Sequence, residues 1–123
     1  MLKGIGQIAI NVHDLERATT FYRDVLGIRY LFSAPPDLAF FEIGGVMLML
    51  SPAENPEFDH PSSLLYFDVD DIRAAHATLK EKGVEFLDEP HRVHKDGERE
   101  LWMSAVRDTE GNTFVLRTWQ TAR

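Results

Sequence analysis

Hydrophobic residues alternate with polar or small ones over residues 5–12, and the spacing then changes to that of a helix. Ile8 and Ile10 share one face of a predicted strand, with polar or small residues between them. From Asp14 onward, apolar residues recur every three or four positions as far as Leu26, and Gly27 follows. This pattern predicts a helix that Asp14 caps at its N-terminus and that ends at Gly27.

Three short apolar runs follow this helix, and they predict strands over residues 28–32, 38–43 and 46–50. A loop with two prolines, residues 33–37, separates the first two runs, and Gly44-Gly45 predicts a hairpin turn between the last two. The first half of the chain therefore predicts one strand, one helix and three further strands.

The same order of patterns restarts after residues 52–63, a segment with three prolines and no periodicity that we predict to be a linker. Residues 64–69 alternate, and Asp70-Asp71 opens a second helical pattern that ends at Gly83. Residues 88–98 are polar, and we expect them to form a mobile loop at the rim of the fold. The remaining predicted strands are residues 84–87, 100–107 and 113–119.

Two stretches align between the halves of the chain. The sequence VHDL at 12–15 corresponds to VDDI at 69–72, and residues 45–50 correspond to residues 111–116. An internal repeat of this kind predicts two copies of one βαβββ module.

Two motifs carry a resemblance to a known family. Residues 12–27, VHDLERATTFYRDVLG, fit the pattern V-x-D-L-x-x-A-x-x-F-Y-x-x-x-L-G, and DTEGN at 108–112 is close to the turn D-P-D-G-N. On these motifs the chain resembles the vicinal oxygen chelate superfamily, the group of glyoxalase I, bleomycin-resistance proteins and extradiol dioxygenases. The resemblance implies an α+β fold in which two tandem βαβββ modules form a cupped mixed sheet with helices on the convex face. It also implies a single domain over 1–123, with module 1 at about 4–51, the linker at about 52–63 and module 2 at about 64–119.

Metal-dependent members of this superfamily place four ligands on the cup, usually His, Glu or Gln. The resemblance places these four positions at Gln7, Met49, Leu64 and Val115. One amide, one thioether and two aliphatic side chains do not supply the oxygen or imidazole donors that a hard divalent cation needs. We therefore predict no metal and no other cofactor, which argues against a metal-dependent glyoxalase or dioxygenase activity.

The strand faces opposite the helices are predicted to line the cup. Their side chains are mostly apolar with a few polar groups, a composition typical of small-molecule sites. Among them, Arg117 is a candidate to bind a carboxylate or phosphate through paired hydrogen bonds, and Tyr66 is a candidate hydrogen-bond donor. The predicted lining residues are Gln7, Ala9, Asn11, Phe41, Met47, Met49, Leu64, Tyr66, Met103, Thr113, Val115 and Arg117.

Charge and composition narrow the range of partners. The 123 residues include 13 basic and 20 acidic side chains, which gives a formal net charge of −7. An acidic chain does not provide the basic surface that nucleic acids or anionic membranes require. The chain has no cysteine, so disulfides and thiolate metal sites are excluded. We expect no signal peptide, no membrane span and a cytoplasmic location.

Three functions remain open on the sequence. The first is a metal-free protein of the bleomycin-resistance type that binds a small molecule, and the resemblance implies a homodimer for it. The second is a cryptic enzyme, a lyase, isomerase or dioxygenase-like protein, that uses acid–base residues or a non-family metal site. His91 and His94 would begin such a site, with Glu98, Glu100 or His60 as the third ligand. The third is a structural module whose own side chains fill the cup.

Overall fold

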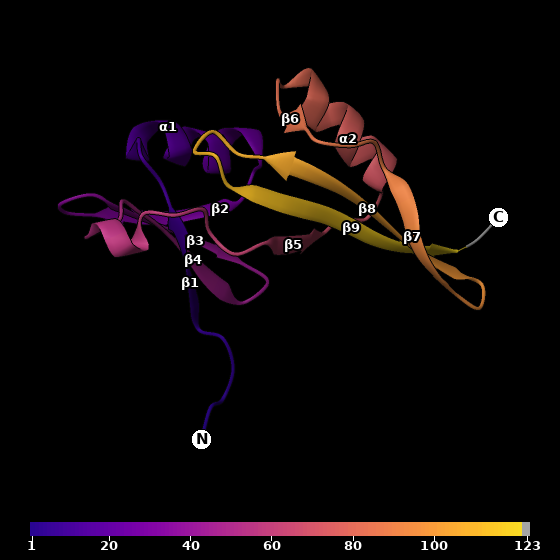
Figure 1. The fold of residues 1–123 in the computed structure, drawn as a ribbon, viewed down its shortest axis with the longest axis horizontal. Coiled ribbons are helices and arrows are strands. Elements are labelled where there is room, and N and C mark those ends of the chain that lie inside the picture. Colours follow the sequence, from indigo (N-terminus) through magenta and orange to yellow (C-terminus); the bar gives the residue numbers. More distant parts are fainter. Residues whose placement is uncertain (122–123) are drawn as a thin grey trace. The chain divides into compact units, whose positions relative to one another are not determined.

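The computed structural model describes residues 1–121, and these divide into two compact units with the boundary between Ser62 and Ser63. Each unit consists of one sheet with a helix packed on one of its faces (Figure 1). The predicted α+β class is confirmed. No helix within residues 1–121 is long and apolar enough to cross a membrane.

The sheet of the first unit has four strands in the order β1-β4-β3-β2. The pair β1 and β4 is parallel, and the other two pairs are antiparallel. The parallel pair needs a long crossover connection, which the helix and the other two strands provide. The strands are β1 (Gln7–Asn11), β2 (Arg29–Ala34), β3 (Leu38–Ile43) and β4 (Val46–Ser51).

The helix of the first unit begins as α1 (Leu15–Thr20) and widens into a π-helical turn over Phe21–Val25. The Asp14 side chain accepts a hydrogen bond from the backbone N–H of Arg17, so the predicted N-cap is present. The sequence predicts one regular α-helix over this segment, whereas the structure has a π-helical turn in its second half. Both aromatic residues at the start of that turn, Phe21 and Tyr22, are buried.

The second unit repeats this plan with the strand order β5-β9-β8-β6, and β7 pairs with the other part of β8. The pair β5 and β9 is parallel, and α2 (Ile72–Glu81) packs on β8 and β9. The side chain of Asp71 caps α2, because it accepts hydrogen bonds from the backbone N–H groups of Arg73 and Ala74. The strands are β5 (Leu65–Asp68), β6 (Glu85–Phe86), β7 (His91–Asp96), β8 (Arg99–Arg107) and β9 (Thr113–Thr121).

The turn between β8 and β9 is held by a buried carboxylate. Asp108 Oδ1 accepts hydrogen bonds at 2.8 Å from the backbone N–H groups of Glu110 and Asn112, and Oδ2 accepts one at 2.9 Å from the Asn112 side chain. Gly111 has a φ of +85°, a conformation that glycine adopts without steric cost. These contacts explain why the sequence DTEGN forms this turn.

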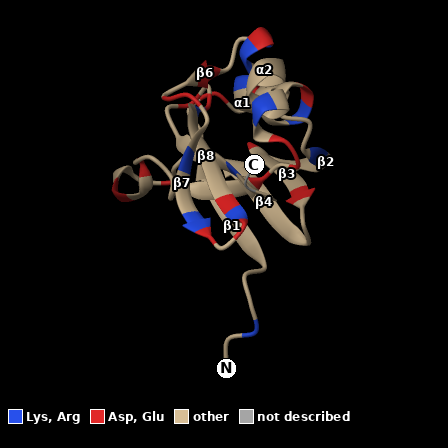
Figure 2. Ribbon diagram, turned by 90° about the vertical axis from the view of Figure 1, so that its right-hand side faces the viewer, with Lys and Arg blue, Asp and Glu red and all other residues tan. Residues whose placement is uncertain are grey.

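The prediction of a mobile loop over residues 88–98 is wrong in its central part. Residues His91–Asp96 form β7, an edge strand that pairs antiparallel with β8. All six of its residues are exposed, so neither face of the strand carries an apolar stripe. Lys, Arg, Asp and Glu residues gather at the tip of this hairpin, as Figure 2 shows.

Candidate functional site

The face of the first sheet that carries no helix is the first part of the candidate site; we call it open face 1. In parallel strands, residues at the same register position point to the same side. Ile8 and Ile10 pair with Leu48 and Leu50, which are buried under the helix. The residues between them therefore lie on open face 1, and these are Gln7, Ala9, Asn11, Met47, Met49 and Ser51.

Two of the four positions that the resemblance assigns to metal ligands meet on open face 1. The side-chain amide nitrogen of Gln7 lies 3.5 Å from the sulfur of Met49. A thioether is a weak acceptor and a soft ligand, and a neutral amide oxygen is the only hard donor of this pair. In this contact the amide N–H of Gln7 donates a weak hydrogen bond to the sulfur of Met49, and no ion is needed between the two side chains.

Phe41 is predicted to line the cup, and the structure contradicts this prediction. Phe41 pairs with Leu48 on the helix side, is fully buried, and lies 6.3 Å from the ring of Tyr22. Its neighbour Phe40 pairs with Met49 instead and stacks on Phe32 at 4.7 Å between ring centroids. The prediction is displaced by one residue because the strand LAFFEI has apolar residues on both faces, so alternation does not assign them.

The corresponding face of the second sheet, open face 2, follows from the register in the same way. Tyr66 lies beside Val115, and Arg117 lies between Met103 on one side and Asp68 on the other. Thr113 shares this face, and Leu64 is an exposed residue just before β5. The other side of the sheet carries Phe67, Phe114 and Leu116. That the residues of this face line a ligand site stays a prediction.

Charged and aromatic groups lie along one end of open face 2. Arg117 Nε donates a hydrogen bond to Asp68 Oδ1 at 2.7 Å. Two residues further along β9, the ring of Trp119 is covered by the guanidinium of Arg99 at 4.5 Å from the ring centroid. His94 meets the edge of the same ring at 6.3 Å. The sequence analysis did not identify Arg99 as a residue of this face. The one indication in the sequence is that Arg99 and Met103 are an even number of residues apart, which places them on the same face of a strand.

His91 and His94 share open face 2, although residues three apart in a regular strand do not share a face. A bulge in β7 between Arg92 and His94 shifts the register, so that the two histidines pair with Met103 and Leu101. Glu100 points to the other face, where it binds Arg92 and Trp102. Within residues 1–121 there is no cluster of three or more His, Cys, Asp or Glu that would hold a metal ion.

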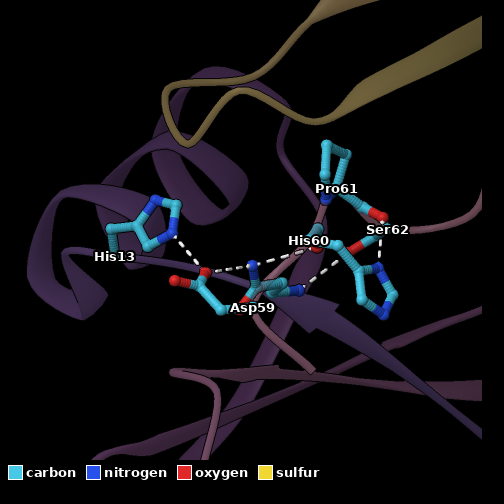
Figure 3. A network of polar contacts seen from close by, with 6 residues as sticks. His13, Asp59, His60, Pro61 and Ser62 are labelled. Carbon is cyan, nitrogen blue, oxygen red and sulfur yellow. Dashed lines mark hydrogen bonds and ion pairs between the residues drawn. The ribbon is translucent and has the colours of Figure 1, made fainter. Parts of the chain in front are cut away.

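The predicted linker packs against the first unit. The side chain of Asn11 donates hydrogen bonds to Asp59 Oδ1 at 3.2 Å and to the carbonyl of His60 at 3.0 Å, and its backbone N–H donates to Ser62 Oγ at 2.8 Å. His13 Nε2 lies 2.8 Å from the same Asp59 oxygen (Figure 3). Asn11, a predicted lining residue, therefore anchors this segment to the edge of β1.

Each unit also holds a cavity away from its open face. The first, of about 370 Å³, lies between the start of the helix and residues 52–59, and His13 and Asp59 are in its wall. The second, of about 610 Å³, is lined by Asp70, Asp71 and Glu100 together with Trp102, whose ring Arg73 covers at 4.9 Å. Neither cavity was anticipated from the sequence.

The pair of His13 and Asp59 predicts a titration that can be measured. The hydrogen bond from His13, and after it the one from Asn11, lowers the pKa of Asp59. A carboxyl whose pKa is depressed on folding stabilises the fold above its unfolded value of about 3.9, and this contribution is lost as the pH falls through the folded pKa. In His13→Ala, we expect an NMR titration of the Asp59 carboxyl to show a higher midpoint than in the unmodified chain.

The control for this titration is His91→Ala, which changes a histidine of the second unit that binds the carbonyl of Glu89. It should leave the Asp59 midpoint where it is. Equal midpoints in the unmodified chain and His13→Ala would show that the contact between His13 and Asp59 does not form in solution.

Comparison with known proteins adds to this geometry. A model of the Glyoxalase/Bleomycin resistance protein/Dioxygenase superfamily matches residues 4–116. The chain is 27% identical over 126 residues to the uncharacterized protein YetH of Bacillus subtilis (strain 168), covering 95% of this chain and 99% of YetH. It is 28% identical over 123 residues to the metallothiol transferase FosB of Staphylococcus epidermidis, covering 96% of this chain and 85% of FosB. The crystal structure of TnmS3, an antibiotic binding protein from Streptomyces sp. CB03234, matches with a TM-score of 0.77 at 25% identity, covering 97% of this chain and 98% of TnmS3.

Proposed function

The chain belongs to the Glyoxalase/Bleomycin resistance protein/Dioxygenase superfamily, and on that premise we propose that it is a metal-free protein that binds a small organic molecule on its open faces. One observation carries the proposal: both faces keep large aromatic side chains in contact with solvent within their units. Phe32 on open face 1 is 49% exposed, and Tyr66 on open face 2 is 50% exposed. Apolar walls with sparse polar groups are typical of sites for small organic molecules.

The absence of a metal from the proposed function rests on the chemistry of the donors. Gln7, Met49, Leu64 and Val115 offer one amide oxygen and one thioether, which do not fit a hard divalent cation. FosB, at 28% identity, is a metallothiol transferase. We do not extend that activity to this chain, because its residues at the four positions do not support it.

The similarity to TnmS3 supports a binding function rather than a chemical step. TnmS3 is an antibiotic binding protein, and it covers nearly the whole of this chain at a TM-score of 0.77. The same fold thus serves in a relative to hold a small molecule.

The proposed assembly is a cytoplasmic homodimer in which the tandem modules form a single domain. The resemblance to bleomycin-resistance proteins suggests the dimer, and the net charge of −7 argues against nucleic acid as a partner. Sedimentation equilibrium tests this assembly directly, because a monomer at all concentrations would contradict it.

The binding function predicts that the native protein takes up a neutral aromatic probe. We expect N-phenyl-1-naphthylamine to show saturable fluorescence enhancement and to raise the melting temperature, since a ligand that binds only the native state stabilises it. In Tyr66→Ser, which removes a ring from open face 2, the affinity should fall about fivefold, the loss expected for an aromatic contact worth about 1 kcal/mol.

The matched control is Phe58→Ser, which removes an aromatic ring that is 55% exposed in the linker segment and lies on neither open face. It should leave the affinity for the probe within about twofold, as expected for an uninvolved surface position. A probe that fails to bind the native chain, or that loses equal affinity in both variants, would overturn the proposed site.

A further inference from the structure

We propose that the molecule bound on open face 2 is an aromatic or aliphatic organic anion, and that Arg117 binds its carboxylate, sulfonate or phosphate group with Arg99 as a second donor. This inference rests on the proposed function, since it names the chemical class of ligand for the same face. In this arrangement Arg117 and Arg99 bind the anionic group, and the apolar residues of open face 2 contact the body of the ligand.

The first argument is the position of Arg117 within the sheet. Strand β9 lies between β5 and β8, so Arg117 stands in the middle of open face 2 and not at its edge. Its side chain is 37% exposed, whereas that of Asp68 is 74% exposed. A charged side chain is costly at a half-buried position beside Met103 unless polar groups surround it.

The second argument is the number of donors that Arg117 has left. A guanidinium carries five N–H donors in a planar fork. The contact with Asp68 uses the Nε–H, and no residue among 1–121 accepts a hydrogen bond from either terminal nitrogen. These two nitrogens can therefore donate in parallel to one anionic group.

The third argument is the state of Arg99. Its guanidinium is held over the ring of Trp119 at 4.5 Å, on the same face as Arg117. Asp96 pairs with Arg99 in the strand register, yet within residues 1–121 no ion pair to Arg99 is formed. Stacking on the indole thus fixes the position of this positive charge without neutralising it.

The balance of charge on this face is less unfavourable to an anion than that of the chain as a whole. The strand residues Arg99, Arg117, Asp68 and Asp96 on this face carry two positive and two negative charges. Their formal charges sum to zero, whereas the formal net charge of the whole chain is −7. An anion is therefore repelled less at open face 2 than over the rest of the molecule.

The apolar neighbours of Arg117 define the rest of the ligand. Met103 lies beside it on β8, and the half-exposed ring of Tyr66 lies across β9 beside Val115, which is only 8% exposed. An apolar body placed on Met103 and Tyr66 brings its anionic end to the guanidinium. The ligand class is therefore an anion with an aromatic or aliphatic body.

Two commercial probes separate the anionic group from the apolar body. The compound 8-anilinonaphthalene-1-sulfonate and N-phenyl-1-naphthylamine share one aromatic body, and only the first carries a sulfonate. The quantity to measure is the ratio of their affinities for the native chain, with near-ultraviolet circular dichroism to verify that each variant keeps its native packing.

Arg117→Met keeps a long side chain and removes the donors. We expect it to lower the ratio of sulfonate to neutral affinity about tenfold, as the loss of a charge-assisted pair of hydrogen bonds implies. Arg117→Lys keeps the charge without the fork, and should lie between Arg117→Met and the unmodified chain. The control is Arg107→Met on the same face. Arg107 lies opposite Thr113, four residues along β9 from Arg117, and its removal should leave the ratio unchanged.

Asp68→Asn provides an independent test that leaves Arg117 in place. It removes the carboxylate that competes for the guanidinium, so the sulfonate probe should bind about two- to threefold more tightly, within the range of an exposed ion pair. A weaker or unchanged affinity in Asp68→Asn would count against the role of Arg117.

The outcomes distinguish this inference from the proposed function. If both probes bind and Arg117→Met leaves their affinity ratio unchanged, the inference is wrong and the binding function stands. If Arg107→Met lowers the ratio as much as Arg117→Met, the anion is not recognised by Arg117 in particular, and the inference is again wrong. If neither probe binds the native chain, the proposed function fails first.

Discussion

Replacing Phe41 by alanine is expected to lower the free energy of unfolding by about 3–5 kcal/mol. The Phe41 side chain is fully buried, and it lies 5.5 Å from the ring of Tyr30 and 6.3 Å from that of Tyr22. Its removal leaves a cavity between the helix and the sheet that the aromatic neighbours cannot fill without leaving their rotamers. Urea denaturation followed by tyrosine and tryptophan fluorescence measures the loss.

The adjacent residue gives the matched control for this prediction. Phe40 lies on open face 1 and is only partly buried, so Phe40→Ala should cost about 1–2 kcal/mol. Should Phe41→Ala fail to fold, Phe41→Leu keeps most of the volume and should cost about 1–1.5 kcal/mol. A larger loss for Phe40→Ala than for Phe41→Ala would reverse the two faces of β3.

Replacing Asp108 by alanine is expected to cost about 2–4 kcal/mol, because buried donors lose a charged acceptor. Asp108 is 6% exposed, and its two oxygens accept three hydrogen bonds from Glu110 and Asn112. The variant keeps the chain length of the turn and removes the carboxylate that accepts these hydrogen bonds. Chemical denaturation gives the loss, and an unchanged slope with denaturant shows that the extent of unfolding is the same.

Thr109→Ala is the control in the same turn. The Thr109 hydroxyl donates to Glu110 Oε2 at 2.8 Å, away from the Asp108 carboxylate, and its loss should cost less than 1 kcal/mol. Asp108→Asn keeps one acceptor oxygen, so its loss of stability should lie between those of Asp108→Ala and Thr109→Ala. If Asp108→Ala were no more costly than Thr109→Ala, the carboxylate would not be what holds this turn.

The sequence predicted the fold well where a single face of each strand is apolar. In β9, the residues Phe114 and Leu116 face the helix, and Thr113, Val115 and Arg117 occupy the other side. In β1 the same alternation separates Ile8 and Ile10 from their neighbours. The N-cap of the first helix, Asp14, was also predicted. For the second helix the sequence predicted only that Asp70-Asp71 opens it, and the structure shows that Asp71 is the capping residue.

Alternation was not informative in two strands, for opposite reasons. The strand β3, LAFFEI, is apolar on both faces, so Phe41 was assigned to the wrong side. The strand β7, HRVHKD, is exposed on both faces, so its polar residues suggested a loop. The pairing that brings His91 and His94 to one face depends on a bulge, and no local pattern in the sequence marks it.

The packing of the linker segment is a third feature that could not be predicted. Asn11 binds Asp59 and His60, which lie 48 and 49 positions further along the chain. Contacts between residues so far apart follow from the tertiary fold and not from local propensity. A proline-rich segment without periodicity was therefore predicted only to be a linker, and its hydrogen bonds to Asn11 at the end of β1 were not foreseen.

The bulged edge strand β7 has a consequence for how copies of this protein behave at high concentration. An edge strand presents unpaired N–H and C=O groups on which the strand of another molecule can form. In β7 the bulge between Arg92 and His94 interrupts the even spacing of those groups, and Lys95 places a charge where an incoming strand would lie. The second sheet is thereby protected from edge-to-edge aggregation at the end where its hairpin projects into solvent.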